Sequence, residues 1–273
     1  MAAGFGPNEM VAVARLVAAV LLLPGFTVGT LADANEPVSP STTEIPYRIS
    51  QSPVGGPGSV ASQIQSDEKP KDSIFDAQET LSDRNSYATF KERMRNDYGL
   101  VFGLDYNMLI QHASSSLGEK DAAGGALRFF GSWAVFGKET GKPGSILFKV
   151  ENRHRLGTEV APQALAGEFG YAGLTALPFS DADTLLTNLY WEQSLNQNRV
   201  GYVAGIVDVT DYVGVYGLVN PWTDFINLVF STDPTIPAPD QGLGAAVRWS
   251  TAQRFYVLGG FADAVGKGQR PAE

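Results

Sequence analysis

The chain has 273 residues, of which 18% are charged, and it carries a net charge of −9. A net negative charge argues against nucleic-acid binding, which depends on clusters of Lys and Arg. The absence of cysteine excludes disulfides, a thiolate nucleophile and a thiolate metal site. A glycine-rich, charge-poor composition is typical of a membrane β-barrel with half-polar strands, and equally of a soluble β-sandwich. Composition therefore leaves two all-β classes open.

Residues 1–34 are predicted to be a signal peptide. A short apolar run at 16–23 is followed by Ala32-Asp33-Ala34, the small-residue pattern of a cleavage site. A transmembrane anchor is disfavoured, because Pro24 interrupts the run well short of the ~20 residues that span a bilayer. An initiator at Met10 would give a more ordinary signal than the first methionine, and the sequence leaves that choice open.

Residues 35–79 are predicted to be a disordered linker. Large apolar residues are few there, so the segment has little surface to bury against the entropy cost of ordering. Its prolines, spread among Ser, Gly and Thr, are Pro37, Pro40, Pro46, Pro53, Pro57 and Pro70.

Residues 80–97 are predicted to form a short amphipathic helix. Tyr87, Phe90 and Met94 recur at helical spacing, while charged residues occupy the other positions. A helix with a role at the mouth of a barrel and an ordinary lead-in helix would both show this pattern. We favour the lead-in helix.

The run from Tyr98 to His112 alternates between apolar and polar residues over about a dozen positions, which indicates a strand with one apolar and one polar face. Soluble strands are usually about 5–6 residues long, whereas a strand that spans a bilayer needs ~9–11. Six further runs alternate in the same way, at 126–136, 145–156, 184–193, 199–208, 242–250 and 253–262. Residues 98–273 are therefore predicted to be a domain of antiparallel membrane-spanning strands.

The connections between these runs alternate between longer and shorter. Their spans are 113–125, 137–144, 157–183, 194–198, 209–241 and 251–252. Outer-membrane barrels alternate long external loops with short periplasmic turns. This assignment treats residues 225–230 as part of the last long loop rather than as a strand.

Several stretches resemble the carbohydrate-selective porin family, OprB. The main ones are Asp208-Val-Thr-Asp-Tyr212, the run from Asn220 to Phe230, and the run from Pro237 to Arg248. The lead-in at 90–95, the strand start at 102–106 and Tyr190-Trp-Glu-Gln-Ser194 are also similar, so the resemblance covers residues 85–262. It implies an antiparallel transmembrane β-barrel of sixteen strands, passive uptake of sugars and a bacterial outer-membrane location.

The polar faces of the strands are predicted to line a water-filled pore, where charged side chains stay hydrated and tune passage. The pore-lining candidates are Asp105, Arg128, Lys149, Glu151, Arg153, Glu192 and Arg248. The candidates for contact with the apolar faces of sugars are Tyr212, Tyr216 and Trp222. The apolar faces are predicted to meet lipid through Phe102, Leu104, Leu127, Phe129, Phe148, Leu189, Tyr202, Val247 and Phe255.

No catalytic or metal-binding motif stands out, and we expect neither an enzyme nor a cofactor. The two histidines lack metal-ligand spacing. Asp208 and Asp211 could join Asp224 or Asp233 at a calcium site, but solvated loop acids are the favoured interpretation. A glycosidase pair of Glu151 and Glu192 is disfavoured against pore-lining charges.

The sequence thus predicts an outer-membrane porin for carbohydrates and other small hydrophilic solutes, with outer-membrane lipid around it. The alternative is a secreted soluble β-sandwich that binds carbohydrate or calcium. Seven strands are an odd number, whereas single-chain bacterial barrels have an even number, and residues 266–273 are polar. We therefore expect an incomplete porin, a fragment whose remaining wall is encoded elsewhere. The preferred sugar and assembly into a homo-oligomer are left open.

Overall fold

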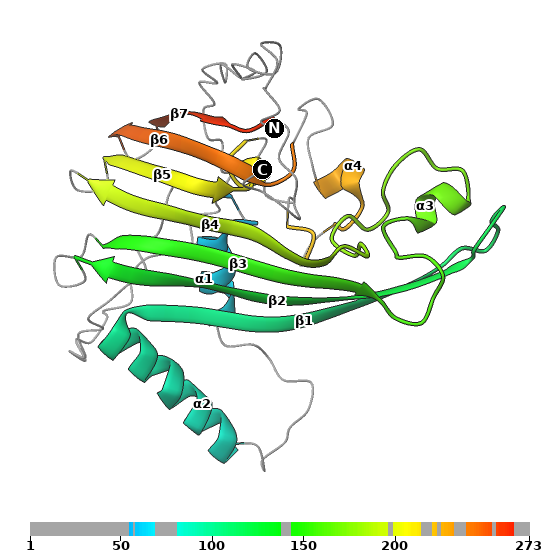
Figure 1. Ribbon diagram of the computed structural model, residues 1–273, viewed down its shortest axis with the longest axis horizontal. Helices are drawn as coiled ribbons and strands as arrows, with labels where there is room; N and C mark the ends of the chain where they lie inside the picture. The colour runs from blue at the N-terminus through cyan, green and yellow to red at the C-terminus, as the bar shows by residue number, and fades with distance from the viewer. Residues whose placement is uncertain are drawn as a thin grey trace, which may run out of the picture.

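The computed structural model describes residues 55–56, 58–68, 81–137, 143–195, 199–213, 220–222, 225–231, 239–252 and 255–264. Within these residues, seven strands form one antiparallel sheet in sequence order (Figure 1). The strands are β1 (Leu100–His112), β2 (Asp121–Phe136), β3 (Gly144–Arg155), β4 (Asp183–Leu195), β5 (Val200–Val207), β6 (Gly242–Ala252) and β7 (Phe255–Ala262). The helices are α1 (Val60–Glu68), α2 (Leu81–Arg93), the π-helix η2 (Met94–Tyr98), α3 (Leu165–Glu168), the 3₁₀ helix η4 (Val209–Asp211) and α4 (Leu228–Ser231). The predicted signal peptide lies outside the described residues.

The sheet is open, with β1 and β7 at its edges, and neither edge pairs with a further strand among the described residues. All seven predicted strands are present. The largest difference in bounds is in β2, which begins at Asp121 rather than at residue 126. The added residues pair with β1, and at the end of this hairpin Asp121 accepts a hydrogen bond of 2.7 Å from the His112 ring.

The connections divide between the two ends of the sheet by length, as predicted. The strand ends that flank the shorter connections, between β2 and β3, β4 and β5, and β6 and β7, are at one end of the sheet, and those that flank the longer connections are at the other (Figure 1). Residues 225–230 contain no strand, which confirms their assignment to a loop: 225–227 are irregular, and 228–231 form the single turn α4.

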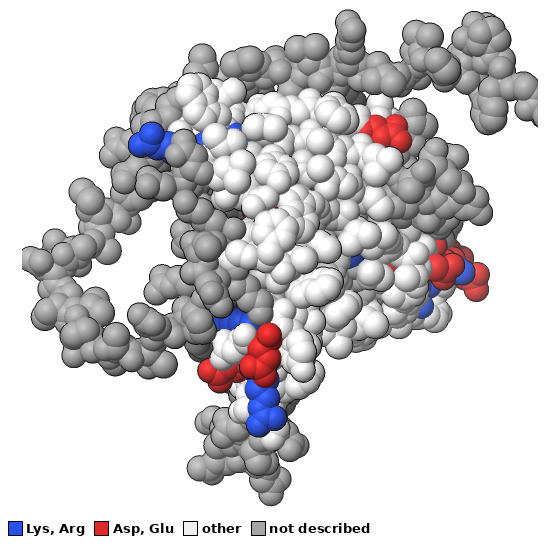
Figure 2. Space-filling model, turned by 60° about the vertical axis from the view of Figure 1, so that its left-hand side comes forward, with Lys and Arg blue, Asp and Glu red and all other residues white. Residues whose placement is uncertain are grey.

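One face of the sheet, here called the outer face, carries exposed apolar side chains. Most of the predicted lipid-facing residues lie there: Leu104, Leu127, Phe129, Leu189 and Val247 are exposed, and Phe102, Phe148 and Tyr202 are partly exposed. The side chain of Phe255 lies outside the description. The surface in Figure 2 is largely uncharged, with the charged side chains gathered near its margins. Exposed apolar side chains in a continuous area mark a surface that contacts lipid or another apolar partner.

The phase of β4 departs from the simple alternation read from the sequence. Lys149 pairs with Asn188 but the next residue, Val150, pairs with Leu186, so Thr187 is an extra residue in the β3–β4 ladder. Because of this bulge, the residues of β4 before Thr187 point to the opposite face from the one that strict alternation predicts. Leu185, which strict alternation would place on the same face as Leu189, is instead buried on the other face, opposite Glu151.

The opposite face, here called the inner face, carries the main apolar core, and helix α1 lies against it. Val60, Ala61 and Ile64 of α1 pack with residues of β1 to β5, namely Val101, Phe130, Ala134, Leu147, Tyr190, Val203 and Val207. Figure 1 shows α1 behind the sheet. The prediction that residues 35–79 have no structure is therefore wrong for 60–68, because the sequence pattern does not reveal the sheet against which this short helix is stabilised.

A helix is present at the predicted position, as α2 and η2, although apolar and polar residues are not clearly separated around α2. It ends at Gly99, whose φ of 68° gives the left-handed cap that only glycine adopts without strain. Tyr87 and Phe90 are each 50% exposed, so the apolar side of the helix is not part of a core. The Phe90 ring meets Phe102 on the outer face, with their centroids 6.1 Å apart.

Candidate functional site on the inner face

The charged candidates come together because alternation and register place them in neighbouring rows of the inner face. Asp105 of β1 pairs with Arg128 of β2, which in turn pairs with Glu151 of β3. Lys149 and Arg153 flank Glu151 on β3, each two residues away, and therefore share its face. Five of the seven predicted pore-lining residues thus form one cluster over three strands.

Arg128 is the centre of the first half of this cluster. Its guanidinium group donates to both carboxylate oxygens of Asp105, at 2.7 Å from Nε and 2.5 Å from Nη2. The same guanidinium lies 4.0 Å from the ring centroid of Trp222, a residue of the connection between β5 and β6. Arginine is suited to this position, because its planar fork pairs with a carboxylate while its face stacks on an aromatic ring.

Glu151 is the centre of the second half. Its side chain is 1% exposed, and Arg153 Nε donates to its Oε2 at 2.8 Å while Lys149 Nζ lies 3.9 Å from its Oε1. We expected these charges to be hydrated in an open lumen. Instead Arg128, Lys149 and Glu151 are buried, so ion pairing and not bulk water offsets the cost of desolvating them.

The bulge in β4 adds a polar pair that the sequence analysis did not select. Thr187 and Asn188 both point to the inner face, where the Thr187 hydroxyl donates to the backbone oxygen of Lys149 at 3.2 Å. The side-chain amide of Asn188 donates to Asp211 Oδ2 at 3.3 Å. Asn188 stood on the predicted polar face of its strand, which is the signal that could have found it; Thr187 had no such signal.

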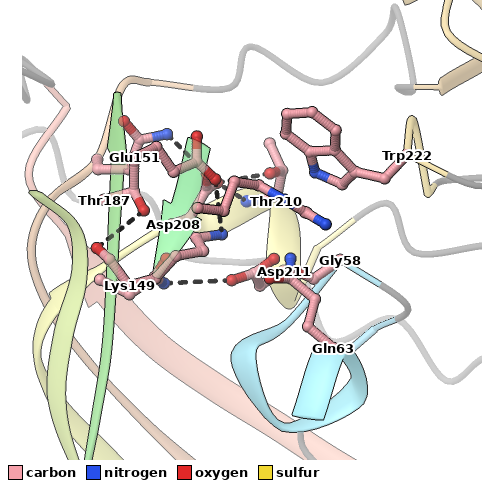
Figure 3. Close-up of polar contacts among 12 residues, drawn as sticks. Gly58, Gln63, Lys149, Glu151, Thr187, Asp208, Thr210, Asp211 and Trp222 are labelled. Carbon is pink, nitrogen blue, oxygen red and sulfur yellow. Dashed lines mark hydrogen bonds and ion pairs between the residues drawn. The ribbon is translucent and has the colours of Figure 1, made fainter. Parts of the chain in front are cut away.

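Asp211, at the end of η4, is buried beneath this cluster (Figure 3). Burial raises its pKa to about 7, and the nearby carboxylate of Asp208 acts in the same direction, while the charge of Lys149 lowers it. Glu151 raises the pKa further. Asp211 is therefore a group outside the strands whose charge state changes near neutral pH.

Asp208 is used to start η4. Its carboxylate accepts from the backbone N–H of Thr210 at 2.9 Å and from the Gln241 side chain at 2.7 Å. Among the described residues, no group of three or more Asp, Glu or His could hold a metal ion. Asp224 and Asp233, the other acids considered for calcium, lie outside the described residues.

The three sugar-contact candidates have different positions. Trp222 lies beside Arg128 and packs on Phe179, with ring centroids 5.6 Å apart. Tyr212 instead packs against the apolar core beneath α1, and burial raises the pKa of its hydroxyl. Tyr216 lies outside the described residues.

The two remaining candidates, Glu192 and Arg248, lie on the inner face nearer the short connections. Glu192 is opposite Val203, and Arg248 is opposite Gly201 on the other side of β5. Arg248 is buried and donates to the hydroxyl of Ser250 at 2.9 Å. They form a second polar region of the inner face, apart from the cluster around Glu151.

The long connections fold over the cluster end of the sheet. Phe179, Trp222 and Ile226 pack with Ala126 of β2. Gln163 and Phe179 are joined through their backbones at 3.1 Å. Two separate loops therefore enclose the side of the inner face on which Arg128 lies.

No helix among the described residues is both long enough and apolar enough to cross a membrane.

Comparison with known proteins identifies the family. No curated protein and no solved structure matches the chain. The family model described as "Carbohydrate-selective porin, OprB family" matches residues 128–269, which is more than half of the chain and runs from β2 to beyond β7. The match confirms the predicted resemblance, although residues 90–95 and 102–106 fall before the matched stretch. Proteins of this family are outer-membrane channels and not enzymes. The chain belongs to the carbohydrate-selective porin family, OprB.

Proposed function

We propose that the seven strands are part of the wall of an outer-membrane pore through which carbohydrates and other small hydrophilic solutes diffuse. The observation that carries this proposal is the inner face, where paired charges lie beside the indole of Trp222. Solutes would pass along this face, while the outer face meets lipid. A sixteen-stranded wall needs further strands, which pair with the open edges at β1 and β7.

The inner cluster has the two kinds of group that a sugar contacts. Sugars present C–H faces that lie on aromatic rings and hydroxyls that bond to charged groups. Trp222 is partly exposed, and Arg128 and Asp105 beside it are donor and acceptor. Opposite charges held in pairs leave a small net field, so neutral solutes are not outcompeted by ions. We assign Trp222 as the sugar contact on this face, with the partly exposed Asp105 as a hydrogen-bond acceptor beside it, and the buried Arg128 as the residue that holds both in position.

Features of the outer face support a position in a membrane. Trp133 and Trp249 are exposed near the short connections, as expected of an aromatic girdle at a membrane interface. Toward the opposite end, a polar chain links Tyr106 to His154 at 2.9 Å and His154 to Asn152 at 2.9 Å. The apolar part of β3 and β4 lies between these two borders, which is the arrangement that a lipid bilayer requires.

A secreted β-sandwich, the alternative function, receives no support. A sandwich buries the apolar face of one sheet against a second sheet. The described residues form a single sheet, and its outer apolar face is exposed.

Two measurements test the proposal. The barrel that this chain forms together with the further strands should remain in the outer-membrane pellet until detergent is added, and liposomes that contain the completed barrel should swell in isotonic sugars at rates that fall with sugar size. Protein recovered in the soluble periplasm, or liposomes that do not swell, would overturn the proposal.

The role of Trp222 has its own test. Trp222→Ala should raise the sugar concentration that half-blocks the ion current by about fivefold, the equivalent of roughly 1 kcal/mol of lost ring contact. Trp249→Ala, a change of the same size on the outer face, should leave this concentration unchanged. Equal effects of the two substitutions would remove Trp222 from the sugar path.

A further inference from the structure

Residues 55–56 and 58–68, here called the inner segment, comprise an ordered turn and helix α1 on the inner face. Ser59 caps α1, because its hydroxyl accepts from the backbone N–H of Ser62 at 3.3 Å. The side chain of Gln63 donates to the backbone oxygen of Gly58 at 2.7 Å, and the Ser62 hydroxyl donates to that of Gly56 at 2.9 Å. These bonds fix the turn before the helix, so the segment has a defined shape.

The apolar side of the inner segment is closely packed on the strands. Val60 is 0% and Ile64 is 1% exposed, while Ser66 on the opposite side of α1 is exposed. The wall accommodates this approach at Gly103, where an added Cβ would lie 2.6 Å from the Phe130 ring and 3.1 Å from Asp67 Oδ2. The helix is thus in contact with the wall, with one side turned away from it.

Polar contacts hold the inner segment at both ends. At its start, the N–H of Gly56 donates to the backbone oxygen of Asp211 at 2.6 Å, and Gly58 lies against the Asp211 carboxylate (Figure 3). At its end, Asp67 pairs with Lys91 of α2 at 2.8 Å, and Glu68 pairs with Arg95 of η2. One end is therefore anchored beside the charged cluster and the other beside the entry to β1.

We propose that the inner segment is a constriction of the channel, lying inside the pore and setting its conductance and its limit on solute size. This inference rests on the proposed function, since it requires that the inner face be the lumen. An α-helix with its side chains is about 10–12 Å wide, which is a large part of the aqueous channel enclosed by 16–18 strands. Asp211 is a positioning residue in this arrangement, because it anchors the start of the segment.

The test compares a substitution on the packed side of α1 with the same kind of change at an exposed position away from the inner segment. Ile64→Asp places a charge in the apolar contact with the wall and should release the segment, raising single-channel conductance roughly twofold and admitting larger sugars. Leu117→Asp makes the same aliphatic-to-acid change at an exposed side chain of the connection between β1 and β2, and should leave both quantities near those of the unchanged protein.

A third variant does not depend on releasing the segment. The chain has no cysteine, so Ser66→Cys gives a single thiol, and coupling it to a bulky methanethiosulfonate reagent should lower the conductance. Leu104→Cys on the outer face, coupled to the same reagent, should not. Coupling at residue 66 without loss of current, failure of that thiol to react, or a folded Ile64→Asp protein with unchanged conductance would each overturn the proposal. If the completed barrel with the unchanged chain conducts nothing, the proposed function itself fails.

Discussion

Replacement of Arg128 by alanine removes both a fixed positive charge and a structural contact from the inner face. Arg128 pairs with Asp105 through two hydrogen bonds and stacks on Trp222 at 4.0 Å. Without it, the Asp105 carboxylate has no cation beside it among the described residues, and the connection that carries Trp222 loses a contact with the wall. We expect both a change in ion selectivity and a loss of stability.

The size of the stability loss follows from the geometry. Removing one partner of a buried ion pair costs about 3–5 kcal/mol, but the Asp105 side chain is 26% exposed and water can solvate it in part. We therefore take about 2 kcal/mol for the pair, from the range for hydrogen bonds to charged groups. The contact with Trp222 adds about 1 kcal/mol, so Arg128→Ala should destabilise the protein by about 3 kcal/mol.

The assay is the reversal potential of single channels in a potassium chloride gradient, together with the temperature at which the folded band on a detergent gel is lost. Arg128→Ala should shift the potential toward cation selectivity, because a fixed positive charge has been removed, and Arg128→Ala with Arg153→Ala should shift it further. Arg128→Lys keeps the charge but not the planar fork, and should restore selectivity while recovering only part of the stability. An unchanged reversal potential in Arg128→Ala would refute the assignment of this residue to the pore.

Three further predictions follow from other parts of the structure. Gly205→Ala should lower the temperature at which the folded band is lost, because the φ of Gly205 is 143° and an added Cβ would lie 2.4 Å from a backbone oxygen of β4. The control is Gly259→Ala, where an added Cβ would have no atom within 4 Å and should leave this temperature unchanged. Equal effects of the two substitutions would contradict the β4–β5 geometry. The pKa of Asp211 is raised by burial to about 7, above the ~3.9 of an exposed aspartate, so the buried arrangement is most stable below about pH 4 and loses stability as pH rises toward 7. Thermal unfolding measured between pH 4 and pH 7 should show this decrease in stability with pH, and Asp211→Asn should remove it. If the pH dependence of stability is unchanged in Asp211→Asn, other groups are responsible for it. Nitroxide labels at Leu104 and Val247 should report apolar surroundings in reconstituted membranes, and labels that report water would reverse the assignment of the outer face.

Most strands of the sheet can be predicted from the sequence, because side chains along a strand point to alternate faces with a repeat of two residues. Alternation between apolar and polar residues is a property of neighbouring positions, so it predicts the strands and the face of Leu104, Arg128 and Glu151 without knowledge of the fold. The lengths of the connections likewise predict which end of the sheet carries the long loops. The family resemblance was also visible in sequence, through the stretches between Asp208 and Arg248.

The tertiary structure decided where alternation fails and what covers the inner face. The extra residue Thr187 is visible only once β3 and β4 are paired, and it moves Leu185 to the other face. Helix α1 is short, and a helix of this length is not stable in isolation; it exists because Val60 and Ile64 pack on a surface made by distant strands. The burial of Glu151 has the same origin, since its desolvation and the cations that compensate for it come from the assembled sheet, whereas the sequence specifies only that this residue points inward.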